Sequence, residues 1–333
     1  MHLMILLNFL LDSCLRRSIR GCGAVMMDII DDKQPYRNTP IIGDLIRTRP
    51  LAAAMGGEVL DVQLHELTDD GFHELEQALF HHKMIFLRDQ HLTLDDQERL
   101  TLRFGDFGTD AYTKGLPGHP EIQPVIKEAN TKSKMVFGGG WHTDSPFLAE
   151  PPSISILHGT EIPAYGGDTL WYNSVLAYEG LSSTMQSLLN HLRVHMSARN
   201  VVDSMRKVAQ DTKGMTAMSD MDLDLDIESM VRGSIHPMVR KHPESGEVAL
   251  YCDGVYAIGI DGMTDHEARP LLQWIVSHIT QEIFTCRLRW EPHTVAIWDN
   301  RVCLHRAFND YDGFRREMLR TTVKGEVPIP AFA

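Results

Sequence analysis

TVAIWDN (residues 294–300) and MLRTTVKG (residues 318–325) are two short runs near the end of the chain that decide its fold class. Both runs are rich in apolar and β-branched residues, a composition that favours β-strands. They flank the segment 301–316. Strands that follow one another without a crossover helix are typical of antiparallel sheets, because parallel strands need a long connection.

The elements predicted upstream begin with helices and continue with short strands. Phe72, Leu75 and Leu79 recur at helical spacing after Thr68, which is a suitable helix N-cap. The other predicted elements are a strand over 84–89, a helix that starts with a capping box at 93–96, a strand over 151–158, a hairpin around 244–246 and a helix over 264–279.

Residues 174–230 are rich in Met, Leu, Asp and Lys, and they predict an inserted helical region. The chain shows no alternation of strands and helices of the βαβ kind. The sequence therefore favours an α+β fold with an antiparallel sheet or a jelly roll over a Rossmann fold.

The composition excludes several classes of protein. With 43% apolar and 23% charged residues, the 333-residue chain is neither disordered nor a fibrous rod. Its net charge of −13 argues against nucleic acid as a partner. Five cysteines, without a CxxC pair or a regular spacing, predict reduced thiols and a cytoplasmic location; they are Cys14, Cys22, Cys252, Cys286 and Cys303.

The first residues form a separate segment. The apolar run 2–11 precedes Arg16, Arg17 and Arg20, which is the reverse of the order in a secretory signal. The run is also shorter than the roughly 20 residues that span a bilayer, so no membrane association is expected. Residues 1–27 are therefore interpreted as a disordered extension or an amphipathic targeting arm, and residues 28–333 as a single domain.

His142 and Asp144, in the segment Trp141-His-Thr-Asp144, are the first candidates for chemistry. On a strand, residues i and i+2 point to the same face, so both side chains could reach one metal ion. A facial iron site needs two histidines and one carboxylate. Two further H-x-[DE] patterns, at 119–121 and 242–244, contain proline and are expected to be surface loops.

A third ligand must come from elsewhere, and His305 is the best candidate because it follows the strand-like run 294–300. Cys303 would share a strand face with His305, but no oxyanion hole accompanies it, so we assign Cys303 to packing. An arginine near an open iron site can bind a carboxylate through two parallel hydrogen bonds. Arg315, Arg316 and Arg320 are available, and Arg315 is expected to pair on the surface with Asp310, Asp312 and Glu317.

Several motifs in order give a more specific signal over residues 45–328. They are FLRDQ (86–90), WHTDSPF (141–147), GGDTLWYN (166–173), HPMVRKHPESG (236–246) and WDNRVCLHRAFNDYDGFRREMLR (298–320). Together they resemble the taurine dioxygenase family of Fe(II)- and 2-oxoglutarate-dependent enzymes, which includes alkylsulfate and phenoxyacetate dioxygenases. The resemblance implies a double-stranded β-helix, a cupin-like jelly roll, with flanking helices.

The resemblance also implies roles for individual residues. His142, Asp144 and His305 would bind Fe2+, while Arg316 and Thr169 would bind 2-oxoglutarate. Arg320 matches an arginine that holds the sulfonate of taurine or, in other members, helps to bind 2-oxoglutarate. Trp298 and Asn300 are interpreted as structural supports.

Two departures from the family pattern concern the substrate. Asp110 stands where taurine enzymes carry a sulfonate-binding histidine, and a carboxylate there would repel an anion. The asparagine that usually precedes WHTD is replaced by the glycine-rich segment 137–140. Tyr256 matches an aromatic that lines the substrate pocket, although it could instead pack under the loop after the hairpin.

The implied reaction uses O2 to hydroxylate a small organic acid of the sulfonate, alkyl sulfate or aryloxyalkanoate type. 2-Oxoglutarate is converted to succinate in the same cycle. Hydroxylation of another metabolite is the nearest alternative, and a zinc hydrolase or a non-catalytic binding module on the same fold stays open. A small-molecule substrate and a homo-oligomer, either a dimer or a tetramer, are expected from the resemblance.

Overall fold

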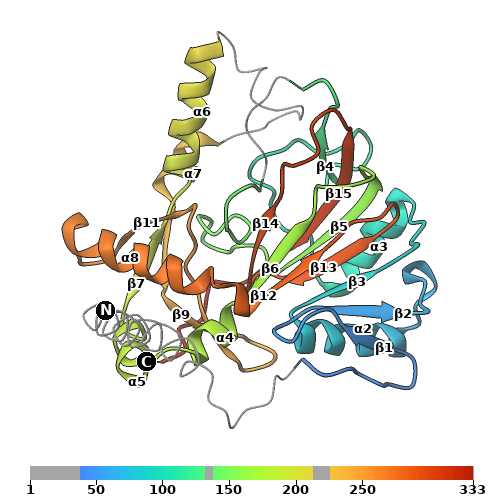
Figure 1. The fold of residues 1–333 in the computed structure, drawn as a ribbon, viewed down its shortest axis with the longest axis horizontal. Helices are drawn as coiled ribbons and strands as arrows, with labels where there is room; N and C mark the ends of the chain where they lie inside the picture. Colours follow the sequence, from blue (N-terminus) through green and yellow to red (C-terminus); the bar gives the residue numbers. More distant parts are fainter. Residues whose placement is uncertain (1–37, 132–137, 213–225, 333) are drawn as a thin grey trace, which may run out of the picture.

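The computed structural model describes residues 38–131, 138–212 and 226–332 (Figure 1). The predictions for residues 1–27, including Cys14 and Cys22, lie outside these ranges. The other three cysteines, Cys252, Cys286 and Cys303, are free and buried.

A seven-stranded sheet forms the largest element of the fold. Its strands run in the order β1 (Arg47–Pro50), β2 (Gly57–Leu60), β3 (Met84–Leu87), β13 (Val295–Asp299), β5 (Ile154–Glu161), β15 (Arg316–Val323) and β4 (Gln123–Lys127). Neighbouring strands are antiparallel except for β2 and β3. The two runs that suggested the fold are β13 and β15, and both lie inside this sheet.

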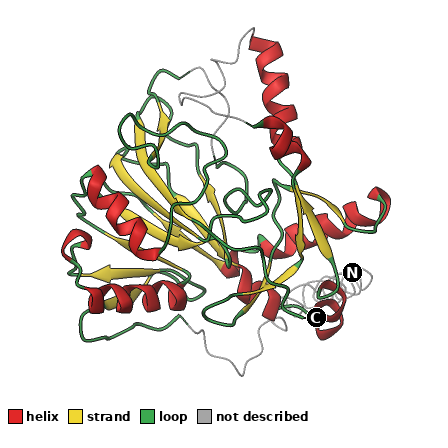
Figure 2. Ribbon diagram, turned by 180° about the vertical axis from the view of Figure 1, so that it is seen from behind, coloured by secondary structure: helices red, strands yellow, loops and turns green. Residues whose placement is uncertain are grey.

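Strand β13 shows how the sheet is covered on both faces. Val295 and Ile297 belong to an apolar cluster with helices α2 (Asp69–His82) and α3 (Leu94–Phe104), whereas Ala296 and Trp298 belong to a second cluster. Alternate side chains of a strand point to opposite faces, so the sheet is buried between two layers. The two helices are seen along the outer side of the sheet in Figures 1 and 2.

The layer opposite these helices is a three-stranded sheet in the order β12 (Thr285–Leu288), β6 (Thr169–Asn173) and β14 (Cys303–Ala307). Trp171 of β6 and Cys303 of β14 share an apolar cluster with Trp298 of β13, so the two sheets pack face to face. The ends of these two sheets carry the candidate functional residues.

The helix starts follow the predicted capping residues. Thr68 accepts a hydrogen bond from the backbone N–H of Gly71 at the start of α2, and Thr93 forms a capping box with Asp96 at the start of α3. These side chains satisfy backbone N–H groups that have no partner within the helix. Both helix predictions are confirmed.

The rest of the described chain forms a third apolar cluster beside the two sheets. Its elements are α4 (Ser174–Glu179), α5 (Ser183–Leu189), β7 (Arg193–Met196), α6 (Arg199–Thr212), α7 (Ile227–Arg232), β8 (Ser234–Pro237), β9 (Val239–Lys241), β10 (Val248–Leu250), β11 (Ala257–Ile260) and α8 (Asp265–Ile279), with 3-10 turns at η1 (Leu64–Glu66) and η3 (Glu282–Phe284). The region 174–230 thus contains the expected helices. It also contains β7, which the sequence did not predict and which pairs with β8 and β11.

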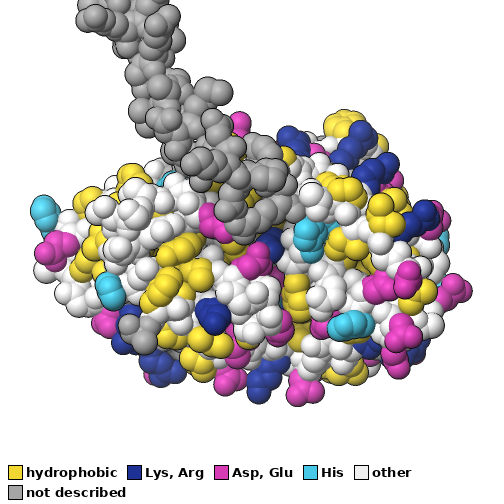
Figure 3. Space-filling view, turned by 90° about the horizontal axis from the view of Figure 1, so that it is seen from below, with side chains coloured by type: hydrophobic (Ala, Val, Ile, Leu, Met, Phe, Trp, Pro, Cys, Tyr) yellow, Lys and Arg dark blue, Asp and Glu magenta, His cyan; other side chains and the backbone are white. Residues whose placement is uncertain are grey.

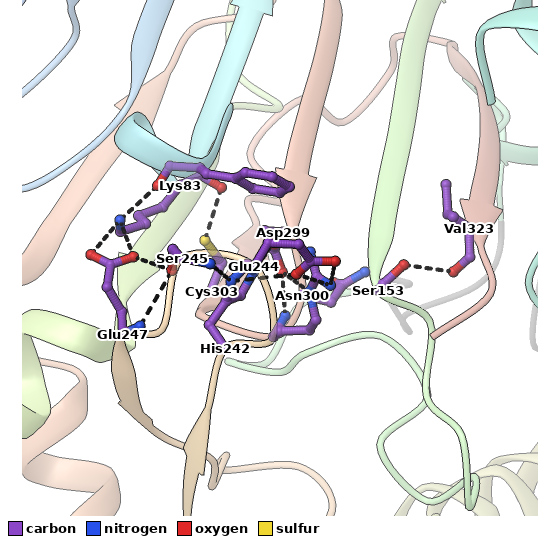
Figure 4. Close-up of polar contacts among 12 residues, drawn as sticks. Lys83, Ser153, His242, Glu244, Ser245, Glu247, Asp299, Asn300, Cys303 and Val323 are labelled. Atoms are coloured by element: carbon purple, nitrogen blue, oxygen red, sulfur yellow. Dashed lines mark hydrogen bonds and ion pairs between the residues drawn. The ribbon is translucent and has the colours of Figure 1, made fainter. Parts of the chain in front are cut away.

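The predicted hairpin around residues 244–246 is confirmed as β9 and β10. Its turn is tied to the main sheet by buried polar groups (Figure 4). His242 Nε2 lies 2.8 Å from Asp299 Oδ2, and the ammonium of Lys83 donates to both oxygens of Glu247 at 2.7 Å. The prediction that His242 lies in a surface loop is therefore wrong, because the buried carboxylate of Asp299 requires hydrogen-bond donors.

The surface has mixed charge on the face shown in Figure 3. Outside the area under grey atoms, Lys and Arg side chains there are interspersed with Asp and Glu. Among the described helices, none has the length and apolar character needed to cross a membrane.

Candidate metal centre and active site

Three side chains that can bind a metal meet beside β14 of the three-stranded sheet β12–β6–β14. His142 and Asp144 come from the loop before β5, and His305 comes from β14. Their candidate ligand atoms all lie within 4.8 Å of one another, and all three residues are buried. The distances from Asp144 Oδ1 are 3.9 Å to His142 Nε2 and 3.7 Å to His305 Nε2.

The segment around His142 is not the strand that the sequence suggested. His142 makes only an isolated antiparallel bridge with His305, through backbone hydrogen bonds of 3.1 and 2.7 Å. Ser145, with φ of 44°, and the following Pro146 turn the chain away and prevent a longer ladder. The bridge nevertheless brings the two histidines together, with ring centroids 4.2 Å apart.

The electrostatic setting favours a neutral His305 and a charged Asp144. Burial, reinforced by the neighbouring His142, lowers the pKa of His305 to about 3. Burial alone would raise the pKa of Asp144, but Arg320 and the two histidines lower it to about 2. The Nδ1 atom of His142 lies 2.8 Å from the carbonyl oxygen of Gly140, which favours the tautomer with its lone pair on Nε2.

The second oxygen of Asp144 is held by a short chain of hydrogen bonds. Ser155 on β5 donates to Asp144 Oδ2 at 2.5 Å, and Asn300 Nδ2 donates to Ser155 Oγ at 2.8 Å. Trp298 Nε1 in turn donates to Asn300 Oδ1 at 2.8 Å. Trp298 and Asn300, expected only as structural supports of the strand and turn, thus also connect to Asp144. Ser155 was not singled out from the sequence, where its signal is a hydroxyl within an apolar strand.

Arg316 is buried on β15, the strand that also carries Arg320. Its Nε and Nη2 atoms have no hydrogen-bond partner among the described residues. The guanidinium lies 5.8 Å from the ring centroid of Trp290 and 6.0 Å from that of Tyr311. Buried donors of this kind carry a large cost unless a ligand accepts their hydrogen bonds.

Thr169 and Arg316 share Trp290 as a neighbour. Trp290 Nε1 donates to Thr169 Oγ1 at 2.9 Å, so the hydroxyl proton of Thr169 remains available for another acceptor. A Cβ built on Gly167, two residues before Thr169, would lie 3.4 Å from Arg316 Nε. Trp290 is a second residue that the sequence alone did not indicate.

Arg315 points away from the site. It pairs with Glu128, Glu161 and Glu317 at the surface, so the expected surface role and the Glu317 partner are confirmed. The other two expected partners contact different groups: Asp310 accepts from the backbone N–H of Gly167, and Asp312 pairs with Lys127.

Asp110, Arg320 and Tyr256 lie near Asp144 and His142. Arg320 Nη2 donates to Asp110 Oδ2, and Arg320 Nη1 lies 3.4 Å from Asp144 Oδ1. Tyr112 donates its hydroxyl proton to the Tyr256 hydroxyl at 2.7 Å. The Tyr256 ring centroid is 6.3 Å from that of His142, so Tyr256 borders the candidate metal centre.

Cys303 has no nucleophile geometry. Its buried thiol donates to the backbone carbonyl of Lys83 at 3.3 Å, and burial raises its pKa well above the usual range. A thiol that stays protonated is a poor nucleophile, in agreement with the packing role.

Comparison with known proteins gives one family. The model of the "Taurine catabolism dioxygenase TauD, TfdA family" matches residues 47–322. A sulfate ester dioxygenase of Pseudomonas putida is 32% identical over 84% of this chain and 90% of its own. A (S)-phenoxypropionate/alpha-ketoglutarate-dioxygenase of Sphingobium herbicidovorans is 27% identical over 78% of this chain and 88% of its own.

Solved structures agree with these relatives. A taurine dioxygenase from Burkholderia xenovorans has a TM-score of 0.70 and 32% identity, and the alignment covers 86% of this chain and 91% of that one. A structure of AAD-2 with Mn(II) and N-oxalylglycine has a TM-score of 0.66 and 26% identity, with 85% and 98% coverage.

Proposed function

Because the chain belongs to the TauD/TfdA family of 2-oxoglutarate-dependent dioxygenases, we propose that His142, Asp144 and His305 bind its Fe(II) and that Arg316 and Thr169 bind its 2-oxoglutarate. The observations that carry the proposal are the buried His–Asp–His cluster and the buried donors of Arg316, on the same strand as Arg320, which contacts Asp144. We further propose the double-stranded β-helix of the family for the two packed sheets, a cytoplasmic location and a dimer or tetramer.

The donor set suits Fe(II). Two neutral imidazoles and one carboxylate form the facial set typical of non-haem iron, which leaves the opposite face open. Ser155 binds one oxygen of Asp144 and leaves the other directed at the histidines. The hydrogen bond between His142 and Gly140 fixes the ring that presents Nε2.

The surroundings of Arg316 suit a dicarboxylic co-substrate. Its planar guanidinium can donate two parallel hydrogen bonds to the far carboxylate of 2-oxoglutarate. Thr169 can donate its hydroxyl proton to the same carboxylate, because its own lone pair is engaged by Trp290. The buried rings of Trp290 and the nearby Tyr311 would keep water from that end.

The substrate proposed is a small organic acid with an oxidisable C–H bond. When bound, Fe(II) with 2-oxoglutarate and O2 supplies the oxidant that hydroxylates this bond, with release of succinate and CO2. If the hydroxylated carbon carries a sulfate, sulfonate or aryloxy group, the product breaks down to an aldehyde or ketone. The printed names of the relatives, a sulfate ester dioxygenase and a phenoxypropionate dioxygenase, support a first panel of such acids.

The test is anaerobic addition of Fe(II) and 2-oxoglutarate, followed by absorbance at roughly 500–550 nm, where the chelate gives a charge-transfer band. We expect the band, together with succinate formation in air. His142→Ala should abolish both without unfolding the protein. His119→Ala, in a competing H-x-E pattern, should leave both unchanged. Full succinate formation by His142→Ala would refute the metal assignment, and metal binding without a band would favour the zinc or binding-module alternative.

A further inference from the structure

The positive charge of Arg320 is paired with carboxylates of the protein. Its Nη2 atom donates to Asp110 Oδ2, and its Nη1 atom lies 3.4 Å from Asp144 Oδ1. The side chains of all three residues are at most 8% exposed. Asp144 is the proposed metal ligand, so Asp110 is the carboxylate that offsets the charge of Arg320, and the Arg320–Asp110 pair carries no surplus positive charge for a substrate anion.

Asp110 is held so that it cannot easily turn away. Its Oδ1 atom accepts from the backbone N–H groups of Tyr112 and Thr113, at 2.8 and 2.7 Å, and from the Thr113 hydroxyl at 3.1 Å. These three donors fix the carboxylate plane and direct Oδ2 at Arg320. Displacement of the pair by a substrate anion would leave a buried carboxylate without its cation, which is strongly unfavourable.

Three of the neighbouring side chains are aromatic. Tyr112 and Tyr256 join through their hydroxyls, and the ring of Phe147 lies 5.3 Å from that of Tyr256 and 5.7 Å from that of Tyr112. These rings are buried and border His142 and Asp110. A wall of this kind suits an apolar or neutral polar group.

We propose that Asp110 is a specificity-determining residue, which neutralises Arg320 so that the part of the substrate next to Arg320 is an uncharged group such as an ester, ether or amide. This inference rests on the proposed function and specifies the substrate class at that site.

The test compares isosteric acids and amides as ligands. The full chain, loaded with Mn(II) and N-oxalylglycine to prevent turnover, is titrated calorimetrically with hexanesulfonate and hexanesulfonamide. We expect the wild type to bind the sulfonamide more tightly. Asp110→Asn keeps the Oδ1 acceptor but loses the charge, so its preference for the sulfonate over the sulfonamide should rise at least about tenfold. A preference that is unchanged or falls would overturn the proposal.

Asp106→Asn is the matched control, because Asp106 is exposed and the substitution changes the net charge equally. Its sulfonate preference should stay within about twofold of the wild type. An equal rise in both variants would mean that net charge alone acts, and would also overturn the proposal.

A double variant keeps the test decisive if Asp110→Asn does not fold. Asp110→Asn/Arg320→Gln removes one charge of each sign, and no buried charge loses its partner within this pair. If Arg320 is already neutralised, the sulfonate preference stays within about twofold of the wild type. A fall of about tenfold would show that Arg320 binds the acid in the wild type.

These results are separable from the proposed function. Absence of the charge-transfer band and of succinate formation would refute the dioxygenase site. If the wild type forms succinate but Asp110→Asn shows the same sulfonate preference as the wild type, only the role of Asp110 is refuted.

Discussion

Ser155 donates a 2.5 Å hydrogen bond to Oδ2 of Asp144, while Oδ1 of the same carboxylate is the oxygen that faces His142 and His305. Ser155→Ala should weaken Fe(II) binding by about 10- to 100-fold, because groups that orient a metal ligand commonly contribute that much. Anaerobic Fe(II) titration measures the effect. Ser153→Ala is the control, since its hydroxyl donates to the backbone of Val323 and Lys324. Equal affinities in both variants would contradict the orienting role.

Arg316→Gln should raise the KM for 2-oxoglutarate by about 100-fold or more, because two charge-assisted hydrogen bonds to a buried carboxylate are lost. Fe(II) affinity should change far less. The measurement is a 2-oxoglutarate titration of the charge-transfer band together with steady-state kinetics. Arg315→Gln, which removes only surface ion pairs, should leave KM within about twofold. A small effect of Arg316→Gln on this KM would show that Arg316 does not bind 2-oxoglutarate.

His242→Ala should lower the free energy of unfolding by about 2–4 kcal/mol, because it leaves the buried Asp299 carboxylate without one of its donors. Urea unfolding monitored by tryptophan fluorescence measures the loss. His191→Ala, at an exposed position, should change stability by less than about 0.5 kcal/mol. If both variants were equally stable, the hairpin would not depend on this buried contact.

His82 predicts a pH dependence of stability. Its burial, reinforced by the nearby His81 and Lys83, lowers its pKa from 6.5 to about 3. The unfolded chain therefore binds a proton more readily, so this contribution to stability is present above pH 6.5 and is lost as the pH falls towards 3. At pH 5 the loss is about 2 kcal/mol.

Urea unfolding at pH 7.5 and 5 tests this prediction. The wild type should lose about 2 kcal/mol more on acidification than His82→Gln. His73→Gln, on the exposed side of the same helix, should behave as the wild type. An equal pH response in the wild type and His82→Gln would show that His82 is not the group that titrates.

Local signals predicted the elements that carry them. Thr68 and Thr93 mark helix starts, and the apolar runs of β13 and β15 have the composition of buried strands. Strand β7 alternates polar and apolar residues over only four positions, which is too short to be distinctive, and its pairing partners β8 and β11 lie far along the chain. The contacts that make it a strand are tertiary.

The candidate site was predicted through motifs, and its supporting residues were not. His142, Asp144 and His305 stand in recognisable segments, and the structure brings them together; their roles as iron ligands stay predictions. Ser155 and Trp290 support Asp144 and Thr169 across 11 and 121 positions of sequence. Spacing along a chain cannot show such partners, because folding alone makes them neighbours.

The central position of β13 has a consequence for synthesis of the protein. This strand fills the gap between β3 and β5, although the ribosome makes it after most of the chain. In a nascent chain that ends before Val295, no strand lies between the edges of β3 and β5, and His305 has not yet been made. Pairing over such long sequence separations is slow, and unpaired strand edges are prone to aggregation. Translation must therefore be nearly complete before the sheet can close, and incomplete chains are candidates for chaperones and proteases.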